Sequence, residues 1–237
     1  MWAEANLDVT QPDKFAASPF QYDCSFVSWG NVDMHNPINE HSFEYNWGGI
    51  NNQAPYYEGQ VYGETPGNDI NGDIPPSHDV AFVQMGAPWR LPTDLEFAEL
   101  LDNCDYVEAD GNTVIPVETA DKTVTVNNVV GIYLKSKNNG NLLFFACTGW
   151  GTNANYENRG AISFYWSSTN GSERYAHGLY FYHGAGAQVG NRYRYYGIPV
   201  RPVFNNNRRL ALSALSKYAG LKVKDDLEPI VSEKTKQ

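Results

Sequence analysis

The sequence predicts a single domain of the α+β class, and three observations predict it. A capping motif precedes an apolar helical segment in "WRLPTDLEFAELLDNC". An Asn-Gly turn joins two strand-like runs between residues 122 and 147, and further strand-like runs follow after residue 161. At 237 residues the chain is long enough to bury a sizeable core.

Residues 1–88 are expected to form short strands and long ordered loops. They are rich in Asn, Gly, Pro and aromatic residues, include short apolar pieces such as "CSFVSWG", and show no helical periodicity. The strand-like run "WAEANLDV" directly follows Met1, so we expect that the given chain could begin inside a longer natural protein.

The helix is expected to begin after Thr93, because Thr93 and Glu96 have the spacing of a capping box. One face of this helix carries Leu95, Ala98 and Leu101, with Phe97 and Leu100 beside it.

The second half of the chain predicts β structure. "KTVTVNNVVGIYLKSK", the turn "NNGN" and "LLFFAC" indicate a hairpin. "GWGTNANYENRG" is expected to be a loop, and "ISFYWSS", "AHGLYFYH" and "RYRYYGIPVRPVF" are expected to be strands separated by glycine-rich turns. The domain is expected to span residues 1–204. Residues 205–237 are expected to be a helical extension with a frayed end, which docks on its own domain, on another subunit or on a larger assembly.

The composition limits the possible partners. The formal charge is −10 overall. Residues 205–237 hold seven Lys/Arg and four Asp/Glu, a charge of +3, which leaves −13 for residues 1–204. An acidic body repels phosphate backbones, so nucleic acid is not expected as a partner. The chain has no apolar run long enough for a membrane helix and no export signal at its start, so no membrane insertion is expected.

Tyrosine is concentrated in one part of the chain. Seven of the 16 tyrosines lie between residues 165 and 196. Because neighbouring side chains of a strand point to opposite faces, Leu179 and Phe181 are expected in the core and Tyr180 and Tyr182 on the outside. "RYRYY" is expected to repeat this alternation. Tyr with Ser, Gly and Asn is the composition of a binding surface, although tyrosine is also common on ordinary strands, where it forms cross-strand pairs.

Four segments in order resemble a known family. They are "DIPPSHDVAFVQMGAPWRLPTDLEFAELLDNC", "GIYLKSKNNGNLLFFACTG", "YWSST" and "RYYGIPVRPV". Together they are similar to the major paralogous domain of gut Bacteroidetes and their phages, a resemblance that covers roughly residues 2–204. It implies a C-type-lectin-like fold, with short twisted antiparallel sheets, one or two helices and long ordered loops.

Within that family the chain looks most like the variable proteins of diversity-generating retroelements, whose C-terminal segment is rewritten by adenine-directed mutagenesis. The resemblance implies a variable segment at residues 165–203, between "YWSS" and "VRPV". Eleven residues there are permitted outcomes of a randomised asparagine codon, and we take them as the candidate ligand-binding residues. They are Asn170, Ser172, Arg174, Tyr175, His177, Tyr180, Tyr182, His183, Asn191, Tyr193 and Tyr195. Glu173 and Gln188 would be fixed or derive from another codon type.

The rest of this segment would form a constant framework. Its apolar members would hold the strands in register, while Gly197 and Pro199 fix a bend. The apolar framework residues are Trp166, Leu179, Phe181, Ile198 and Val200. Arg201 is expected to be a hydrogen-bonded structural residue.

Other chemistries are weakly supported, and no cofactor is expected. "NDINGDI" places Asp69, Asn71 and Asp73 as in a calcium loop, but Ile74 replaces the glycine and Val80 the bidentate glutamate. The sugar-binding motifs of calcium-dependent lectins are absent. "GAGAQVG" has the wrong glycine spacing for a dinucleotide loop.

No catalytic arrangement is recognised, so an enzyme is not expected. Ser167 and Ser168 lack a glycine elbow and a visible His/Asp partner. The same fold family includes formylglycine-generating enzymes, which rely on paired cysteines. The three cysteines, Cys24, Cys104 and Cys147, are scattered and are expected to be buried thiols rather than a disulfide framework or zinc site.

These features predict a ligand-binding protein on a phage virion or a bacterial cell surface, with a cell-surface protein or glycan as its ligand. A homo-oligomer or attachment to the virion is possible under this hypothesis. The alternative is a non-variable adhesin or structural module of the same fold.

Overall fold

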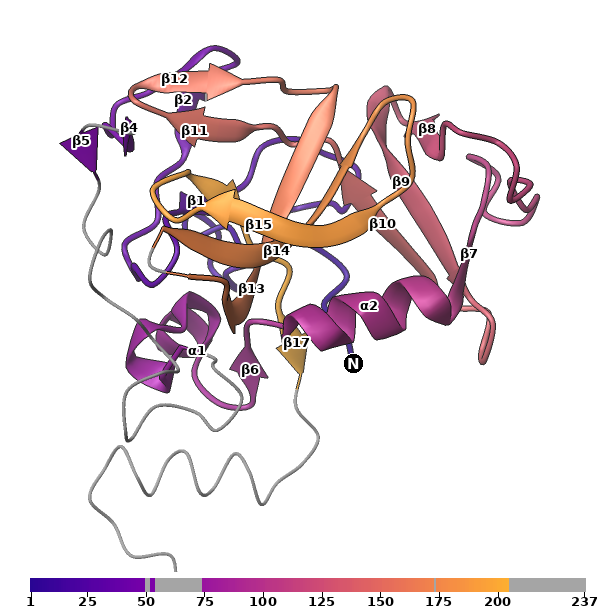
Figure 1. Ribbon diagram of the computed structural model, residues 1–237, viewed down its shortest axis with the longest axis horizontal. Coiled ribbons are helices and arrows are strands. Elements are labelled where there is room, and N and C mark those ends of the chain that lie inside the picture. Colours follow the sequence, from indigo (N-terminus) through magenta and orange to yellow (C-terminus); the bar gives the residue numbers. More distant parts are fainter. Residues whose placement is uncertain (50–51, 54–73, 173, 205–237) are drawn as a thin grey trace, which may run out of the picture.

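The computed structural model describes residues 1–49, 52–53, 74–172 and 174–204. The described chain is mostly β, with two short α-helices, several small antiparallel sheets and long ordered loops between them (Figure 1). The helices are α1 (Val80–Met85) and α2 (Asp94–Asp102), and a 3-10 turn, η1 (Pro76–His78), precedes α1. The predicted α+β class is therefore confirmed at this level.

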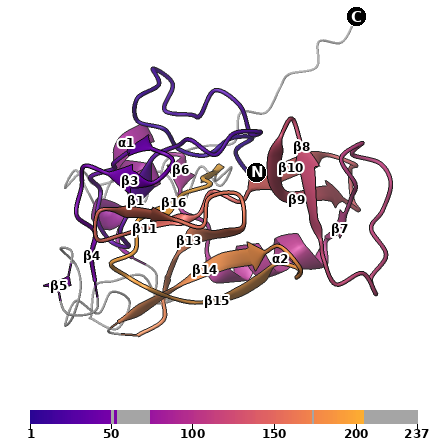
Figure 2. The ribbon, with the colours of Figure 1, turned by 90° about the horizontal axis from the view of Figure 1, so that it is seen from above.

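Two larger sheets form one side and the middle of the molecule. The first joins β7 (Cys104–Tyr106), β8 (Thr123–Val126), β9 (Val129–Ser136) and β10 (Leu142–Ala146). The second has the order β13 (Ile162–Asn170), β14 (Tyr175–Tyr182) and β15 (Gln188–Tyr193). Figures 1 and 2 place the β7–β10 sheet at one end of the molecule and the β13–β15 sheet in its middle.

The remaining strands are short. A four-stranded sheet has the order β11 (Trp150–Thr152), β12 (Asn155–Glu157), β3 (Ser42–Phe43) and β2 (Pro37–Asn39). Three two-stranded pairs are β1 (Phe26–Val27) with β16 (Ile198–Pro199), β6 (Trp89–Arg90) with β17 (Val203–Phe204), and β4 (Gly48–Gly49) with β5 (Asn52–Gln53).

The predicted hairpin between residues 122 and 147 is confirmed, and it holds an additional turn. β9 pairs with β10 across the "NNGN" turn and with β8 on its other side. The β8–β9 turn consists of Asn127 and Asn128, with φ of 50° and 64°. Asparagine tolerates this left-handed region better than most residues, because its short polar side chain can hydrogen-bond locally.

Helix α2 begins with the predicted capping box. The Thr93 hydroxyl accepts from the Glu96 backbone N–H at 3.1 Å, and the Glu96 carboxylate accepts from the Thr93 N–H at 2.9 Å. The expected apolar face was wrong in part, because Leu95 is 75% exposed while Phe97 is fully buried. The large Phe97 ring fills the space between the helix and the β13–β15 sheet, which leaves Leu95 on the solvent side.

Three segment predictions need correction. "GWGTNANYENRG" is not a loop throughout, because it contains β11 and β12. The last three residues of the glycine loop at 184–190 belong to β15. The predicted strand at 192–204 is divided, because the chain turns after Tyr193. Residues 1–88 also contain the helix α1, whose six residues are too few to show a periodic pattern.

The β13–β15 sheet lies between two cores. Phe164 and Trp166 of β13 pack with Val27 and Trp29 on one face, whereas Tyr165, Leu179 and Phe181 pack with Phe97 on the other. The Trp29 Nε1–H donates to the Ser167 carbonyl and the Trp166 Nε1–H to the Val27 carbonyl, both at 2.8 Å. The predicted apolar framework residues are all buried.

Arg201 joins the N-terminal segment to strand β10. This fully buried side chain donates to Asn6 and to the carbonyls of Ala3, Glu4 and Phe144. Its expected structural role is therefore confirmed. The three cysteines are free and buried, as expected.

Two predictions fall on residues that the structure does not describe. The calcium-loop candidate (Asp69, Asn71 and Asp73) and the helical extension (205–237) both lie outside the described residues. Among the helices that the structure describes, none has the length and apolar character needed to cross a membrane.

Candidate functional site

The candidate site is the β14–β15 hairpin, which carries most of the predicted ligand-binding residues. β14 is the central strand, with Leu179 paired to Val189 and Tyr180 paired to Gln188 of β15. Leu179 and Phe181 are fully buried, whereas Tyr182 is 41% exposed and Tyr180 is half-buried. The predicted alternation along β14 is therefore confirmed for these residues.

The predicted residues do not share one face of the sheet. Tyr175, His177, Asn191 and Tyr193 lie on the same face as Leu179, which packs against α2. Tyr180 and Tyr182 lie on the opposite face. β15 is an edge strand of this sheet, and its exposed residues Asn191 and Gln188 belong to different faces, so both sets reach solvent along the free edge.

On the face of the sheet that carries Tyr180, the Arg192 side chain contacts two aromatic rings. Its guanidinium carbon lies 3.6 Å from the centroid of the Tyr180 ring and 4.2 Å from that of Phe164. The Tyr180 hydroxyl also accepts from Gln188. An arginine stacked on aromatic faces combines a cation with flat apolar area, which is typical of binding surfaces.

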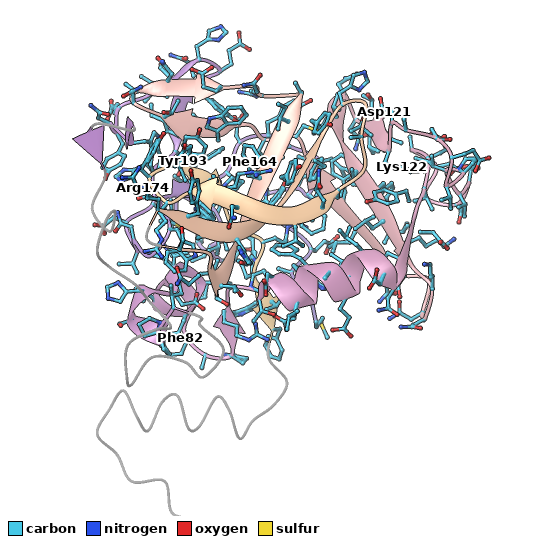
Figure 3. The ribbon with its side chains drawn as sticks, in the orientation of Figure 1. Phe82, Asp121, Lys122, Phe164, Arg174 and Tyr193 are labelled. Atoms are coloured by element: carbon cyan, nitrogen blue, oxygen red, sulfur yellow. The ribbon has the colours of Figure 1, made fainter. Side chains whose placement is uncertain are left out.

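The other face has its own aromatic pair at one end of the hairpin. The rings of Tyr175 and Tyr193, which are cross-strand partners, have centroids 4.7 Å apart. Tyr193 also contacts Tyr196 edge-on at 5.7 Å, and the exposed Arg174 directly precedes β14. Figure 3 shows Tyr193 and Arg174 at this end of the hairpin and Asp121 at the opposite end.

His177 joins the sheet to the start of α2. Its ring Nδ1–H donates to the Asp94 carboxylate at 2.6 Å, and the Thr169 hydroxyl lies 3.2 Å from the same carboxylate. The His177 side chain is 30% exposed. His177 is therefore held by a partner rather than free to turn, and Asp94 is a site residue that the sequence did not reveal.

His183 is anchored at the turn between β14 and β15. Its Nδ1 lies 3.0 Å from Asp121 Oδ2 and 3.0 Å from the Thr123 hydroxyl. Burial would raise the pKa of Asp121, but hydrogen bonds from the Thr123 backbone and hydroxyl hold it below its usual range. The imidazole remains 72% exposed, so it can contact a ligand.

Asn170 and Ser172 have a structural task. Arg194 is 1% exposed, and its guanidinium donates to the Asn170 side chain and to the Ser172 carbonyl. The same guanidinium lies 4.6 Å from the centroid of the Trp29 ring. Arg194 therefore fixes the loop between β13 and β14, and replacing Asn170 would remove one of its acceptors.

The expectation that Tyr195 faces outward is wrong. Tyr195 is 5% exposed and packs against Tyr193 and Tyr196. Because β15 ends at Tyr193, the strand alternation no longer applies two residues later.

The described residues offer little for covalent or metal chemistry. Burial raises the pKa of Cys24 and of Cys147 to about 12, which keeps both thiols protonated and unreactive near neutral pH. The Ser167 hydroxyl donates to the His177 carbonyl rather than to its ring. Within the described ranges no three His, Cys, Asp or Glu side chains gather closely enough to hold a metal ion.

Comparison with known proteins places the hairpin inside one family match. Residues 107–203 are similar to a domain of unknown function, DUF8237. The matched region includes β8 to β16 and therefore the whole β13–β15 sheet. Neither the curated proteins nor the solved structures include a significant match to this chain.

Proposed function

We propose that this protein is a ligand-binding protein that displays a diversified, tyrosine-rich surface on a C-type-lectin-like scaffold. The observation that carries the proposal is the contrast within β14, where Leu179 and Phe181 are fully buried while Tyr182 is 41% exposed. The strand thus separates residues that hold the fold from residues that offer contact area.

The chemistry of the exposed set supports recognition. Tyrosine provides a large, rigid contact area and a hydroxyl, and arginine and tyrosine are enriched among residues that dominate binding energy. Here Arg192 and Tyr193 lie on the free edge strand β15, where Arg192 lies over the Tyr180 ring and Tyr193 contacts the ring of Tyr175. The ligand would be a cell-surface protein or a glycan.

The separation of scaffold and surface also supports diversification. Exposed side chains typically change stability by only about 0.5 kcal/mol or less, so many replacements are tolerated. The buried framework, including Trp166 and Arg201, would have to stay constant. This arrangement suits a retroelement target on a phage virion or a bacterial surface, where display in several copies would raise a modest single-site affinity.

Sequencing the gene from many isolates tests the diversification. We expect substitutions at Tyr180, Tyr182 and Tyr193 that trace to template adenines, with a template repeat and reverse transcriptase gene nearby. Codons for Trp166 and Leu179 are the controls and should not change. Substitutions spread evenly along the gene would instead favour a non-variable adhesin or structural module of the same fold.

A binding assay tests recognition. Replacing Tyr180, Tyr182 and Tyr193 with alanine should abolish the binding of labelled protein to intact Bacteroidetes cells. Tyr133→Ala is the matched control, because this half-exposed tyrosine lies on β9 and packs on Phe20. Unfolding of the triple variant would mean that these rings support the core, and unchanged cell binding would reject the proposed surface.

A further inference from the structure

A groove of about 620 Å³ lies outside the hairpin, between the first residues of the chain, α2 and the β9–β10 hairpin. Figures 1 and 2 both place the N-terminus close to α2. The lining residues on which the inference depends are Trp2, Glu4, Glu99, Leu100, Cys104 and Leu143.

The lining of the groove is apolar in part and acidic. Trp2, Leu100 and Leu143 are half-buried hydrophobic residues on the edge of the core around Phe97. Glu4 and Glu99 are exposed at the groove. The described lining has no lysine or arginine, and its third glutamate, Glu96, is already ion-paired with Arg90 at 2.6 Å, so Glu4 and Glu99 carry its negative charge. The groove therefore suits a segment that is both apolar and basic.

The described chain ends at this groove. Val203 lines it, and the next residue, Phe204, donates its backbone N–H to the Met1 carbonyl at 2.6 Å. The amino group of Met1 donates back to the Phe204 carbonyl at 3.1 Å. Whatever follows Phe204 must therefore start beside the groove.

The sequence that follows has the matching chemistry. In "RRLALSALSKYAGLK", residues 208–222, helical spacing would place Leu212, Leu215 and Tyr218 on one face. Arg208 and Lys222 would lie at the two ends of this face. A helix of this length is about 22 Å long at 1.5 Å per residue.

We propose that residues 208–222 of this same chain occupy the groove, with Leu212, Leu215 and Tyr218 on its apolar floor and the basic ends toward Glu4 and Glu99. The proposal does not rest on the proposed function. Residues 205–207 span at most about 10 Å, so the segment is tethered at its binding site. A short tether gives an effective concentration on the order of millimolar, which favours the chain's own segment over that of a second copy.

Disulfide trapping in the full chain tests the proposal, because Cys104 already lines the groove. Leu215→Cys should form an intramolecular disulfide with Cys104 on mild oxidation, identified by peptide mapping. Cys24 and Cys147 are fully buried and will not compete. The matched control is Ser213→Cys, which helical spacing places on the opposite face and which should cross-link several-fold more slowly. Glu99→Lys should slow the Leu215→Cys cross-link.

Hydrogen exchange provides a second measurement that does not depend on disulfide geometry. Residues 99–104 should exchange several-fold faster when Leu212 and Leu215 are both replaced by aspartate, while the central strand β14 is unchanged. Equal cross-linking of Leu215→Cys and Ser213→Cys together with unchanged exchange would overturn the proposal. Disulfides that form only between chains would also overturn it, since they would show that the groove holds the segment of a second copy.

Discussion

The Arg192 guanidinium lies over the rings of both Tyr180 and Phe164, with its carbon 3.6 Å and 4.2 Å from the two centroids. The contact joins the edge strand β15 to β14 and β13, and it crosses the position where Gly178 pairs with Gly190. Burial lowers the pKa of Arg192, and its Nε–H is buried with no hydrogen-bond partner among the described residues. The guanidinium is therefore held by its contacts with the two rings together with the hydrogen bond that Nη1 donates to the Asn191 carbonyl.

Two substitutions of Arg192 should separate the contribution of its apolar contacts to stability from the contribution of its charge. Arg192→Ala removes the stacked plane and a partly desolvated cation–π contact, so we expect a loss of about 1–2 kcal/mol in the free energy of unfolding. Arg192→Met keeps most of the apolar contact and should lose less than half as much. Urea unfolding of both variants measures the difference. An equal loss in both would assign the effect to charge instead of packing.

Substitution of Arg201 should lower the free energy of unfolding much more than substitution of Arg192. Its guanidinium satisfies an Asn6 side-chain oxygen and three backbone carbonyls inside the protein. Arg201→Met would leave these acceptors unpaired, and breaking such a buried charged network costs about 3–5 kcal/mol. Arg201→Lys should rescue little, because one ammonium group cannot reach all the acceptors that the planar fork reaches. A loss below 1 kcal/mol in urea unfolding would contradict this account.

Removing the N-cap of α2 should lower the stability by less than the loss of Arg201. Thr93→Ala removes the hydroxyl that accepts from the Glu96 N–H, which should cost about 1 kcal/mol. For a domain of this size that corresponds to a fall in Tm of about 2–4 °C. Thr93→Ser keeps the hydroxyl and should stay close to the wild-type Tm. The same Tm for the alanine and serine variants would mean that the cap contributes nothing.

Local sequence patterns predicted burial and element boundaries correctly where one helix or strand by itself determines the direction of its side chains. The alternation along β14 predicted that Leu179 and Phe181 would be buried, and the capping box predicted the start of α2. The same reasoning placed Tyr195 outside wrongly, because the strand ends before it. Leu95 was misplaced because the packing of Phe97 against another element decides which side of a short helix faces the core.

Contacts between distant segments could not be predicted from the sequence. Asp94 and His177 are 83 residues apart, and no spacing rule brings a helix N-terminus to the middle of a strand. The division of the predicted ligand-binding residues between two faces follows from the register of β14 against β15, which the sequence alone did not define. The tyrosine content therefore led only to the prediction of a binding surface, and the arrangement of these residues on two faces is known from the fold.

Asp79 should make stability depend on pH in an unusual direction. Burial raises the pKa of its carboxyl group to about 6, although hydrogen bonds from the backbone N–H groups of Leu91 and Phe82 oppose this. The folded state then binds a proton more tightly than the unfolded state, whose aspartate has a pKa near 3.9. Stability from this group is fully present below pH 4 and is lost as pH rises through about 6, by up to about 3 kcal/mol. Asp79→Asn keeps an oxygen acceptor for both N–H groups but cannot ionise, so the variant should gain stability relative to wild type as the pH rises from 4 to 7, which is measured as an increase in its free energy of unfolding minus that of wild type. Because every other carboxylate is common to both proteins, this difference isolates Asp79, and a difference that does not change with pH would show that its carboxyl group keeps an ordinary pKa when the protein folds.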